Sequence, residues 1–242
     1  MSHAHDHQHT HEHPAIHEHR DLGEGWLRAA VFGLSDGLVS NTALVLGVAS
    51  GASDGAPVIL AGVAGLLAGA ASMAAGEWIS VTAQRETLEQ ELKTEREHLQ
   101  QYPESEHRHM VEILESAGLS SETADQVALE LLNKPDANLN FHARVELGID
   151  PQDLGSPAVA ALSSFIAFSI GALVPIAPWL LGAPSPTIVT IMASAITLFL
   201  AGAGLSFFTP RGALWSGTRQ LLVGVLAAAL TMAIGAWVGV QV

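Results

Sequence analysis

Residues 57–101 read PVILAGVAGLLAGAASMAAGEWISVTAQRETLEQELKTEREHLQQ, an apolar run that passes without interruption into a charged one. The apolar part, from about Pro57 to Val81, is longer than the roughly 20 residues that a membrane-spanning helix needs. From about Gln84 to Gln101 the chain is charged and contains no helix-breaking residue before Pro103. We therefore expect one continuous helix that crosses the bilayer and extends beyond it.

Four other stretches are long and apolar enough to cross a bilayer, at about residues 26–48, 157–181, 187–208 and 221–238. Only 14% of the residues are charged, against about 25% in soluble domains. The fold class predicted is an all-α membrane protein: five transmembrane helices, with a small cytoplasmic helical metal-binding domain that continues from the second. The expected divisions are a His-rich tail (1–25), helices one and two (26–81), the cytoplasmic domain (82–156) and helices three to five (157–242).

Within 82–156, prolines and glycines divide the chain into three short helices, predicted at about 104–117, 122–133 and 137–147. All ten basic residues fall on one side of the membrane when five spans are threaded with the N-terminus inside. The positive-inside rule therefore predicts a cytoplasmic N-terminus and an external C-terminus. The net charge of −14 argues against nucleic acid as a partner, and the absence of cysteine excludes thiolate metal sites.

Polar side chains within the first two spans are candidates for a transport pathway. Asp36 lies inside the first span, where a carboxylate costs roughly 2.5–3.5 kcal/mol, and Asn41 follows it. Met73 and Glu77, four residues apart, share one face of the second span. A thioether beside carboxylates suits a transition metal better than magnesium or calcium. The alternatives are that Asp36 is hydrated at the interface, that Met73 only fills space and that Glu77 lies at the cytoplasmic mouth.

Carboxylate–imidazole pairs recur in the cytoplasmic segment. They are Glu95 with His98, Glu106 with His109, and His142 with Glu146. Each pair lies on one helical face and suits iron(II), manganese(II), zinc or cobalt(II). The alternative is a solvated acidic surface.

The first 25 residues have a metal-binding composition, and we expect loose, exchangeable binding there. The tail could instead have no role in transport. Its histidines are His3, His5, His7, His9, His11, His13, His17 and His19.

Glycine pairs at four-residue spacing also recur in the spans, and they favour close packing within the bundle over dimerisation. The pairs are Gly33 with Gly37, Gly65 with Gly69, and Gly235 with Gly239.

Several motifs together resemble the vacuolar iron transporter family, in its bacterial branch. They are GLSDGL at 33–38, GAASMAAGE at 69–77, SVTAQRE at 80–86, ELGID at 146–150 and Ser156-Pro157 before the third span. The resemblance covers about residues 25–240. It implies a homodimer with the pathway at the subunit interface, and iron(II) or manganese(II) leaving the cytoplasm in exchange for protons.

By position, the resemblance implies that Asp36 and Met73 bind metal in the membrane, and that Glu95, Glu106 and Glu146 do so in the cytoplasm. The chain departs from familiar members at His98 and His109, where they carry glutamate, and at His142, where methionine occurs. Some members have a carboxylate near the place of Gly65. Imidazole favours zinc, cobalt and nickel relative to harder cations.

The function predicted is therefore proton-coupled efflux of Fe²⁺ or Mn²⁺, with Zn²⁺ and Co²⁺ as further candidates, through a bacterial inner membrane. No prosthetic group is expected, and the expected partners are metal ions, protons, lipid and a second copy. One alternative is a membrane-anchored, ferritin-like di-iron ferroxidase, for which paired Glu-x-x-His is typical. Another is a metal sensor or storage protein without transport. Under the leading interpretation, a transporter, the protein is not an enzyme.

Overall fold

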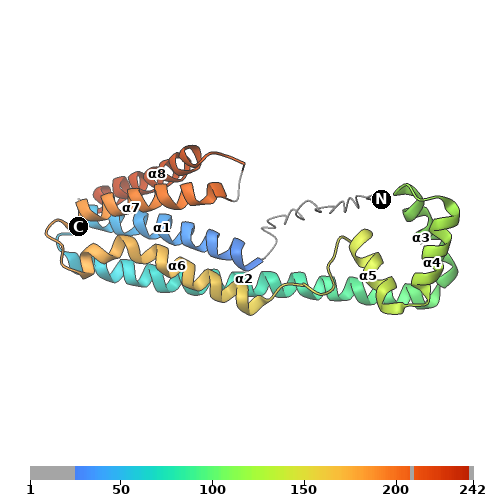
Figure 1. Ribbon diagram of the computed structural model, residues 1–242. Coiled ribbons are helices and arrows are strands. Elements are labelled where there is room, and N and C mark those ends of the chain that lie inside the picture. Colours follow the sequence, from blue (N-terminus) through green and yellow to red (C-terminus); the bar gives the residue numbers. More distant parts are fainter. Residues whose placement is uncertain (1–24, 208–209, 240–242) are drawn as a thin grey trace, which may run out of the picture.

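The computed structural model describes residues 25–207 and 210–239. Over these residues the chain forms eight α-helices and one 3₁₀ turn, and no strand. Five helices are long and apolar enough to cross a membrane, which confirms the predicted number of spans. Figure 1 shows an elongated molecule with a membrane bundle at one end and a small group of helices at the other.

The second helix, α2 (Gly55–Gln101), connects the two parts as the continuous rod predicted from its sequence (Figure 1). Its 47 residues correspond to about 70 Å of helix. Asp54 caps its N-terminus by accepting a hydrogen bond from Ala56 N at 3.0 Å. The rod ends where Tyr102 leaves the helical conformation ahead of Pro103.

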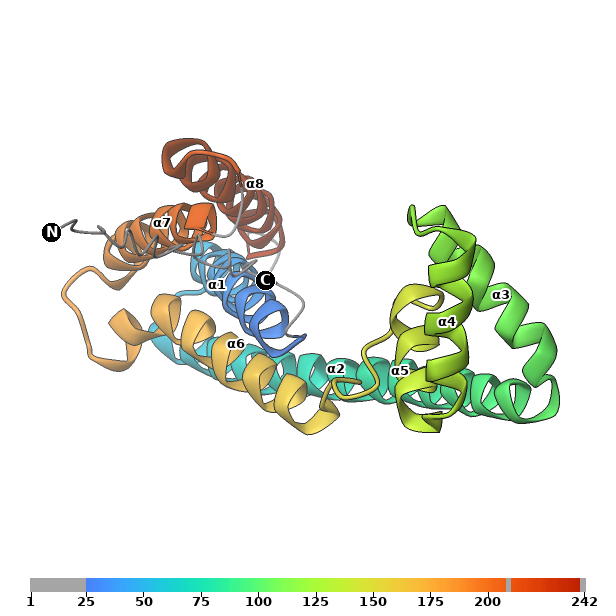
Figure 2. The ribbon, with the colours of Figure 1, turned by 45° about the vertical axis from the view of Figure 1, so that its right-hand side comes forward.

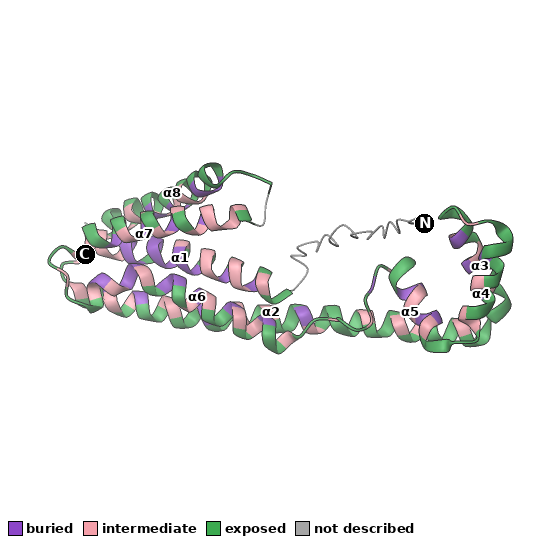
Figure 3. Ribbon diagram, viewed as in Figure 1, coloured by how far each residue is buried: buried purple, intermediate pink, exposed green. Residues whose placement is uncertain are grey.

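The bundle is built around α1 (Gly25–Gly51), which contacts α2, α6 (Pro157–Leu180), α7 (Pro186–Gly204) and α8 (Ala213–Gly239). Figure 3 shows most of the buried residues of the bundle gathered on and around α1. Glycines permit this close packing. A Cβ added to Gly37 would collide with the Phe168 carbonyl of α6, and one added to Gly235 would collide with the Gly47 carbonyl of α1.

The remaining glycine pair, Gly65 with Gly69, is also closely packed, because a Cβ added to Gly69 would collide with the Phe168 ring. The predicted role of the four-residue glycine spacing in internal packing is thus confirmed. Side-chain hydrogen bonds add to it across α1. Thr42 Oγ1 donates to Ser194 Oγ of α7 at 3.0 Å, and Thr231 Oγ1 of α8 donates to the Ala43 carbonyl at 2.6 Å.

We call residues 82–156 the head. Besides the outer part of α2 it contains α3 (Pro103–Ser116), α4 (Ser121–Leu132) and α5 (Pro135–Val145), within two residues of the predicted bounds. Met110, Leu114, Ala124 and Ala128 form a small core between α3 and α4. Figure 2 shows α3, α4 and α5 gathered at the outer end of α2, apart from the bundle.

Two bounds in the last part of the chain differ from expectation. The fourth span ends as α7 at Gly204 and a 3₁₀ turn, η1 (Leu205–Phe207), follows it. The fifth helix, α8, begins at Ala213 rather than near Leu221. The helix extends beyond the predicted span because the charge of Arg219 does not end it. Arg219 is exposed on a helix that continues through it, as arginine side chains at helix ends can reach the interface.

Candidate metal sites

The head brings one imidazole and two carboxylates together. Ligand atoms of Glu95, His142 and Glu146 all lie within 4.8 Å of one another. His142 Nδ1 is 3.3 Å from Glu95 Oε1 and 3.1 Å from Glu146 Oε2. Carboxylate and imidazole ligands are those that iron(II), manganese(II), zinc and cobalt(II) accept. We call these three residues the head cluster.

Two helices that pack against each other position the head cluster. Glu95 is buried on α2, and His142 is fully buried in the last turn of α5. Pro135 begins α5, and Gly148, with a φ of 66°, turns the chain away just after Glu146. A left-handed conformation of this kind is one that glycine adopts without strain.

The other three candidates of the head lie around this cluster at different distances. His109 Nε2 is 3.4 Å from Glu146 Oε1, and the His109 ring stacks on His142 with centroids 6.4 Å apart. Glu106 and His98 are close enough for their charges to act on Glu95, but neither contributes to the tight group. His98 is exposed and makes an edge contact with Tyr102.

The buried polar atoms of the head cluster are incompletely satisfied. Among the described residues, no hydrogen bond reaches Glu95 Oε1 or His142 Nε2, both of which are buried, although His142 Nδ1 lies at ion-pair distance from Glu95 Oε1. Burial raises the pKa of the Glu95 carboxyl above its ordinary value. The His142 imidazole lowers that pKa in part, while the Glu146 and Glu106 carboxylates raise it further. A buried carboxylate beside two others is costly without a cation, so these residues fit a divalent metal ion.

This arrangement predicts opposite effects of Glu95→Gln on stability and on metal binding. Folding raises the pKa of the Glu95 carboxyl, so the protonated group stabilises the folded protein at a pH below its pKa in the unfolded chain. This stabilisation is lost as the pH rises through the pKa of the folded protein. At pH 8 the metal-free variant should therefore melt higher than wild type, by roughly 2–4 °C, and this difference should vanish towards pH 4. Its affinity for Mn²⁺ or Zn²⁺ should fall by at least about a hundredfold, since even outer-shell changes cost roughly 10–100-fold.

Differential scanning fluorimetry and calorimetric titration of the full chain measure the two effects. Glu97→Gln, an exposed glutamate on the same helix, is the matched control and should change neither. If Glu95→Gln melted at a lower temperature than wild type at pH 8 without metal, the Glu95 carboxylate would not be destabilising in the absence of a cation, and its assignment as a metal ligand would be contradicted.

Three of the four intramembrane candidates line a groove of about 360 Å³ between α1 and α2, bounded by Phe168 of α6. These three are Asp36, Asn41 and Met73. The groove thus places a carboxylate, an amide and a thioether, from two helices, around one space.

The Asn41 side chain is held by one end only. Its Nδ2 donates to the Ala172 carbonyl of α6 at 2.6 Å, while its Oδ1 is buried and has no hydrogen-bond partner among the described residues. A Cβ on Gly65 would lie 2.8 Å from this oxygen, so the glycine leaves room for it. The amide oxygen is therefore a fixed acceptor with nothing bonded to it in the groove.

Sequence reasoning missed two serines of the groove and included one residue that lies outside it. Ser40 and Ser72 also line the groove, and Ser40 Oγ donates to the Asp36 carbonyl at 2.6 Å. Spacing could have identified them, since Ser40 lies one turn after Asp36 and Ser72 precedes Met73. Glu77 is half-buried one turn nearer the head and does not line the groove. The histidines at positions 3–19 fall outside the described residues.

Comparison with known proteins finds one family, and relatives named as its members, that match most of the chain. The sequence pattern of the VIT family matches residues 27–236. A vacuolar iron transporter of Acanthamoeba castellanii is 35% identical over 219 residues, which cover 87% of this chain and 78% of the relative. Vacuolar iron transporter 1 of Eucalyptus grandis is 29% identical over 205 residues, covering 84% of this chain and 82% of the relative.

Vacuolar iron transporter 1 of Arabidopsis thaliana is 28% identical, again over 205 residues that cover 84% of this chain and 82% of the relative. These relatives are amoebal and plant proteins, so the bacterial branch stays a prediction. The match extends over both the bundle and the head, which carry the two candidate sites. The chain is a multi-pass membrane protein that belongs to the VIT family.

Proposed function

We propose that the chain carries iron(II) or manganese(II) out of the cytoplasm in exchange for protons. The observation that supports this most directly is the groove in which Asp36, Asn41 and Met73 converge within the membrane bundle. A carboxylate inside the membrane raises the free energy of the folded protein unless it binds a cation or pairs with another group. The relatives described above are named as iron transporters rather than as enzymes, in line with the expectation that this chain is not an enzyme.

The ligand types of the groove favour transition metals as cargo. Oxygen ligands from Asp36 and Asn41 accept any divalent cation, whereas the Met73 thioether adds affinity only for softer ones. The head cluster adds imidazole, which suits zinc and cobalt(II) as well as iron(II) and manganese(II). Zn²⁺ and Co²⁺ are therefore included as candidate cargo.

Proton coupling follows from the chemistry of a single carboxylate. Asp36 can hold a metal ion only when it is ionised, so a proton and a metal ion compete for the same oxygens. None of the described residues that line the groove is basic, so no fixed cation balances the Asp36 carboxylate when both the metal ion and the proton are absent. Release of the metal ion outside would then favour uptake of a proton by Asp36. The proton would be carried to the cytoplasmic side when the metal-free site turns back to face the cytoplasm.

The head would collect ions before they enter the membrane. Met73 and Glu95 lie 22 residues apart on α2, a helical distance of about 33 Å. The rod therefore holds the head cluster well outside the bilayer. Among the described residues, every arginine and lysine belongs to the head, to the first two turns of α1 or α8, or to the residues just before α8. Figure 1 shows the start of α1 and the start of α8 at the end of the bundle nearest to the head. This supports a cytoplasmic head, a cytoplasmic N-terminus and an external C-terminus. The bacterial inner membrane is a further part of the proposal.

A homodimer is part of the proposal, because one protomer leaves its pathway open to the side. Asp36, Ser40 and Leu44 are exposed along one face of α1. An apolar groove of about 590 Å³, lined by Leu44, Gly47 and Gly51, continues along the same face between α2 and α8. A carboxylate facing lipid is unfavourable, so a second copy that covers this face would complete the pathway.

The homodimer is tested by placing a single cysteine at Ser40. The chain contains no cysteine, so Ser40→Cys adds the only thiol. A short bismaleimide should join most of the protein into covalent dimers in liposomes. Ile196→Cys, exposed on α7 away from this face, should remain monomeric under the same conditions. Equal cross-linking of the two variants would contradict an interface on α1.

The alternative functions have less support. A ferritin-like di-iron site needs four long helices facing inward, whereas α3, α4 and α5 have 14, 12 and 11 residues. A sensor or storage protein needs the head cluster but gives no role to the polar groove in the bundle. We therefore place both below the transporter.

Metal flux into proteoliposomes tests the proposed function. Uptake of Fe²⁺, Mn²⁺, Zn²⁺ and Co²⁺ should be measured with and without a pH gradient across the membrane. We expect iron or manganese to cross severalfold faster with the gradient, and the preferred metal to emerge from competition. If every metal binds to the head but none crosses, transport is wrong and the head cluster becomes the function to explain.

A further inference from the structure

A third cavity, of about 490 Å³, lies where the bundle meets the head, and neither candidate metal site uses it. Four parts of the chain surround it: the first turn of α1, the middle of α2, the linker before α6, and the first turn of α6. Its inner end is close to a buried contact between Ala29, Val81 and Ala160. The side chains that give it its chemistry are Trp26, Arg28, Gln84, Leu88, Asp153 and Val159.

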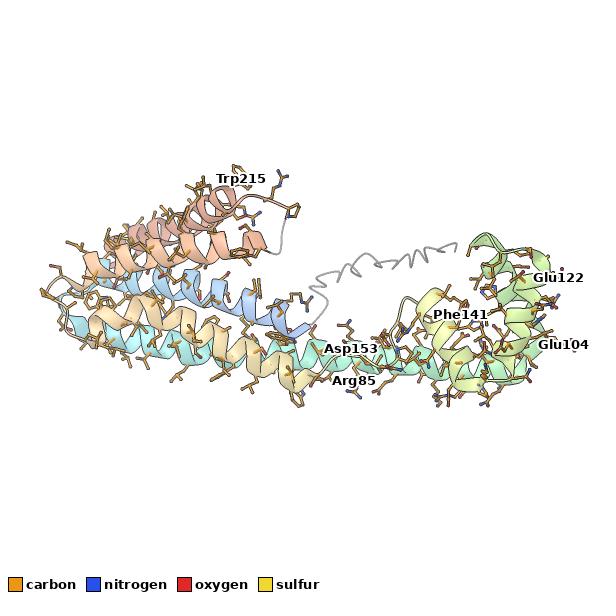
Figure 4. All side chains as sticks on the ribbon, in the orientation of Figure 1. Arg85, Glu104, Glu122, Phe141, Asp153 and Trp215 are labelled. Atoms are coloured by element: carbon orange, nitrogen blue, oxygen red, sulfur yellow. The ribbon has the colours of Figure 1, made fainter. Side chains whose placement is uncertain are left out.

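The cavity lies at the level of the membrane surface. Two spans, α1 and α6, begin beside it, and α2 leaves the bundle there. Trp26 stands at its rim, and tryptophan is enriched where membranes meet water. Figure 4 shows Asp153 on the linker next to α2, between the bundle and the head. A molecule that fills this cavity would reach it from the headgroup layer of the bilayer.

Two opposite charges line the cavity without pairing with each other. Within residues 25–207 and 210–239, neither Arg28 nor Asp153 has an ion-pair partner. The hydrogen bond that Asp153 accepts comes from the neighbouring Gly155 N, at 3.3 Å. The adjacent cation on α2, Arg85, is already bound to Glu89 at 2.7 Å. Among the described residues, the cavity thus presents one cation and one carboxylate without an ion-pair partner, which suits a ligand that carries both charges.

We propose that this cavity binds the headgroup of an ethanolamine phospholipid. The phosphodiester pairs with the Arg28 guanidinium, which can donate two parallel hydrogen bonds to it. The primary ammonium donates to the Asp153 carboxylate and to the Gln84 carbonyl oxygen. The acyl chains leave along the apolar side chains of Trp26 and Val159 towards the bilayer.

Hydrogen-bond donation distinguishes this lipid from choline lipids, and charge distinguishes it from glycerol lipids. A choline headgroup has the same two charges, but its trimethylammonium group has no proton to donate to Asp153. A glycerol headgroup offers Arg28 the same phosphate but leaves the carboxylate of Asp153 without a cation. The carboxylate therefore sets the preference for ethanolamine, and the arginine sets the affinity for phospholipid in general.

Native mass spectrometry of the full-length, detergent-purified chain tests the proposal with lipids of identical acyl chains. Wild type should retain the ethanolamine lipid over the choline lipid by roughly fivefold or more, the size expected for one charge-assisted hydrogen bond at an interface. Asp153→Asn should abolish this preference and leave choline-lipid binding unchanged. Arg28→Gln should weaken both lipids to a similar extent.

Two further arms make the result specific. Arg219→Gln removes a cation from an exposed site on α8 with no acidic residue from 154 to 218 or from 220 to 242, and it should keep the preference. Soluble glycerophosphoethanolamine should not displace the bound lipid, because it lacks the acyl chains. Displacement would assign the site to a free phosphoethanolamine compound instead. Equal retention of ethanolamine and choline lipids by wild type, or a preference that survives Asp153→Asn, would overturn the proposal.

Discussion

Replacing Asp36 by asparagine is expected to reduce metal flux in proteoliposomes to the level of liposomes without protein. Asparagine has nearly the same shape, so the bundle should still form. The groove would lose its one ionisable oxygen pair, and with it the negative charge that compensates a divalent cation. Loss of a carboxylate from a low-dielectric site costs several kcal/mol of ion binding, or at least about a hundredfold in affinity.

The control for this variant is Asp54→Asn. Asp54 caps α2 at the opposite end of the bundle from the head, and asparagine is an equally good cap. Flux through Asp54→Asn should stay close to wild type. Metal binding to the head should be unchanged in both variants, since Asp36 is far from the head cluster. Substantial flux through Asp36→Asn would rule out this groove as the pathway.

The second large effect is expected from a single methyl group at Gly37. A Cβ at this position would overlap the Phe168 carbonyl, a backbone atom of α6 that cannot turn aside as a side chain can. Gly37→Ala should force α1 and α6 apart and destabilise the bundle by about 3 kcal/mol or more. Thermal unfolding followed by circular dichroism should show this as a lower midpoint, with a growing fraction of aggregate in size-exclusion chromatography.

Gly76→Ala provides a control with the opposite sign. Gly76 lies in α2 with nothing within 4 Å of an added Cβ, so alanine there costs no contact. Since glycine within a helix is less favourable than alanine by roughly 0.5–1 kcal/mol, this variant should be as stable as wild type or slightly more stable. Equal destabilisation by the two substitutions would show that helix packing is not the cause.

The parts of the fold that depend on local sequence were predictable. Five spans follow from long apolar runs, and Ser120, Gly118 and Gly148 end or begin the short helices of the head as their chemistry requires. The start of α8 was misplaced because Arg219 is tolerated within a helix near the membrane surface. Bounds of this kind depend on where the bilayer lies, which a charge count alone does not determine.

The sequence named most of the residues of the candidate sites, but it did not predict which of them lie together. The sequence placed Asp36 and Met73 within the first two spans, but it could not show that Ser40 and Ser72 join them in one groove while Glu77 does not. In the head, three equivalent pairs were expected. The fold instead takes Glu95 from the first pair and His142 with Glu146 from the third, and leaves His98 exposed. That choice is made by the packing of α5 against α2, a contact between residues far apart in the sequence.

The continuous rod has a mechanical consequence. Glu95 lies 14 residues beyond Val81, about 21 Å along a helix that has no joint. If α2 tilts by about 5° within the bundle, Glu95 swings sideways by about 1.8 Å, by lever geometry on that helical rise. His142 and Glu146 lie on or just after α5, so they follow this movement only as far as the packing of α5 against α2 carries them. Metal–ligand distances vary by only about 0.2 Å, so that packing has to move with the rod if the head cluster is to keep its ligand geometry.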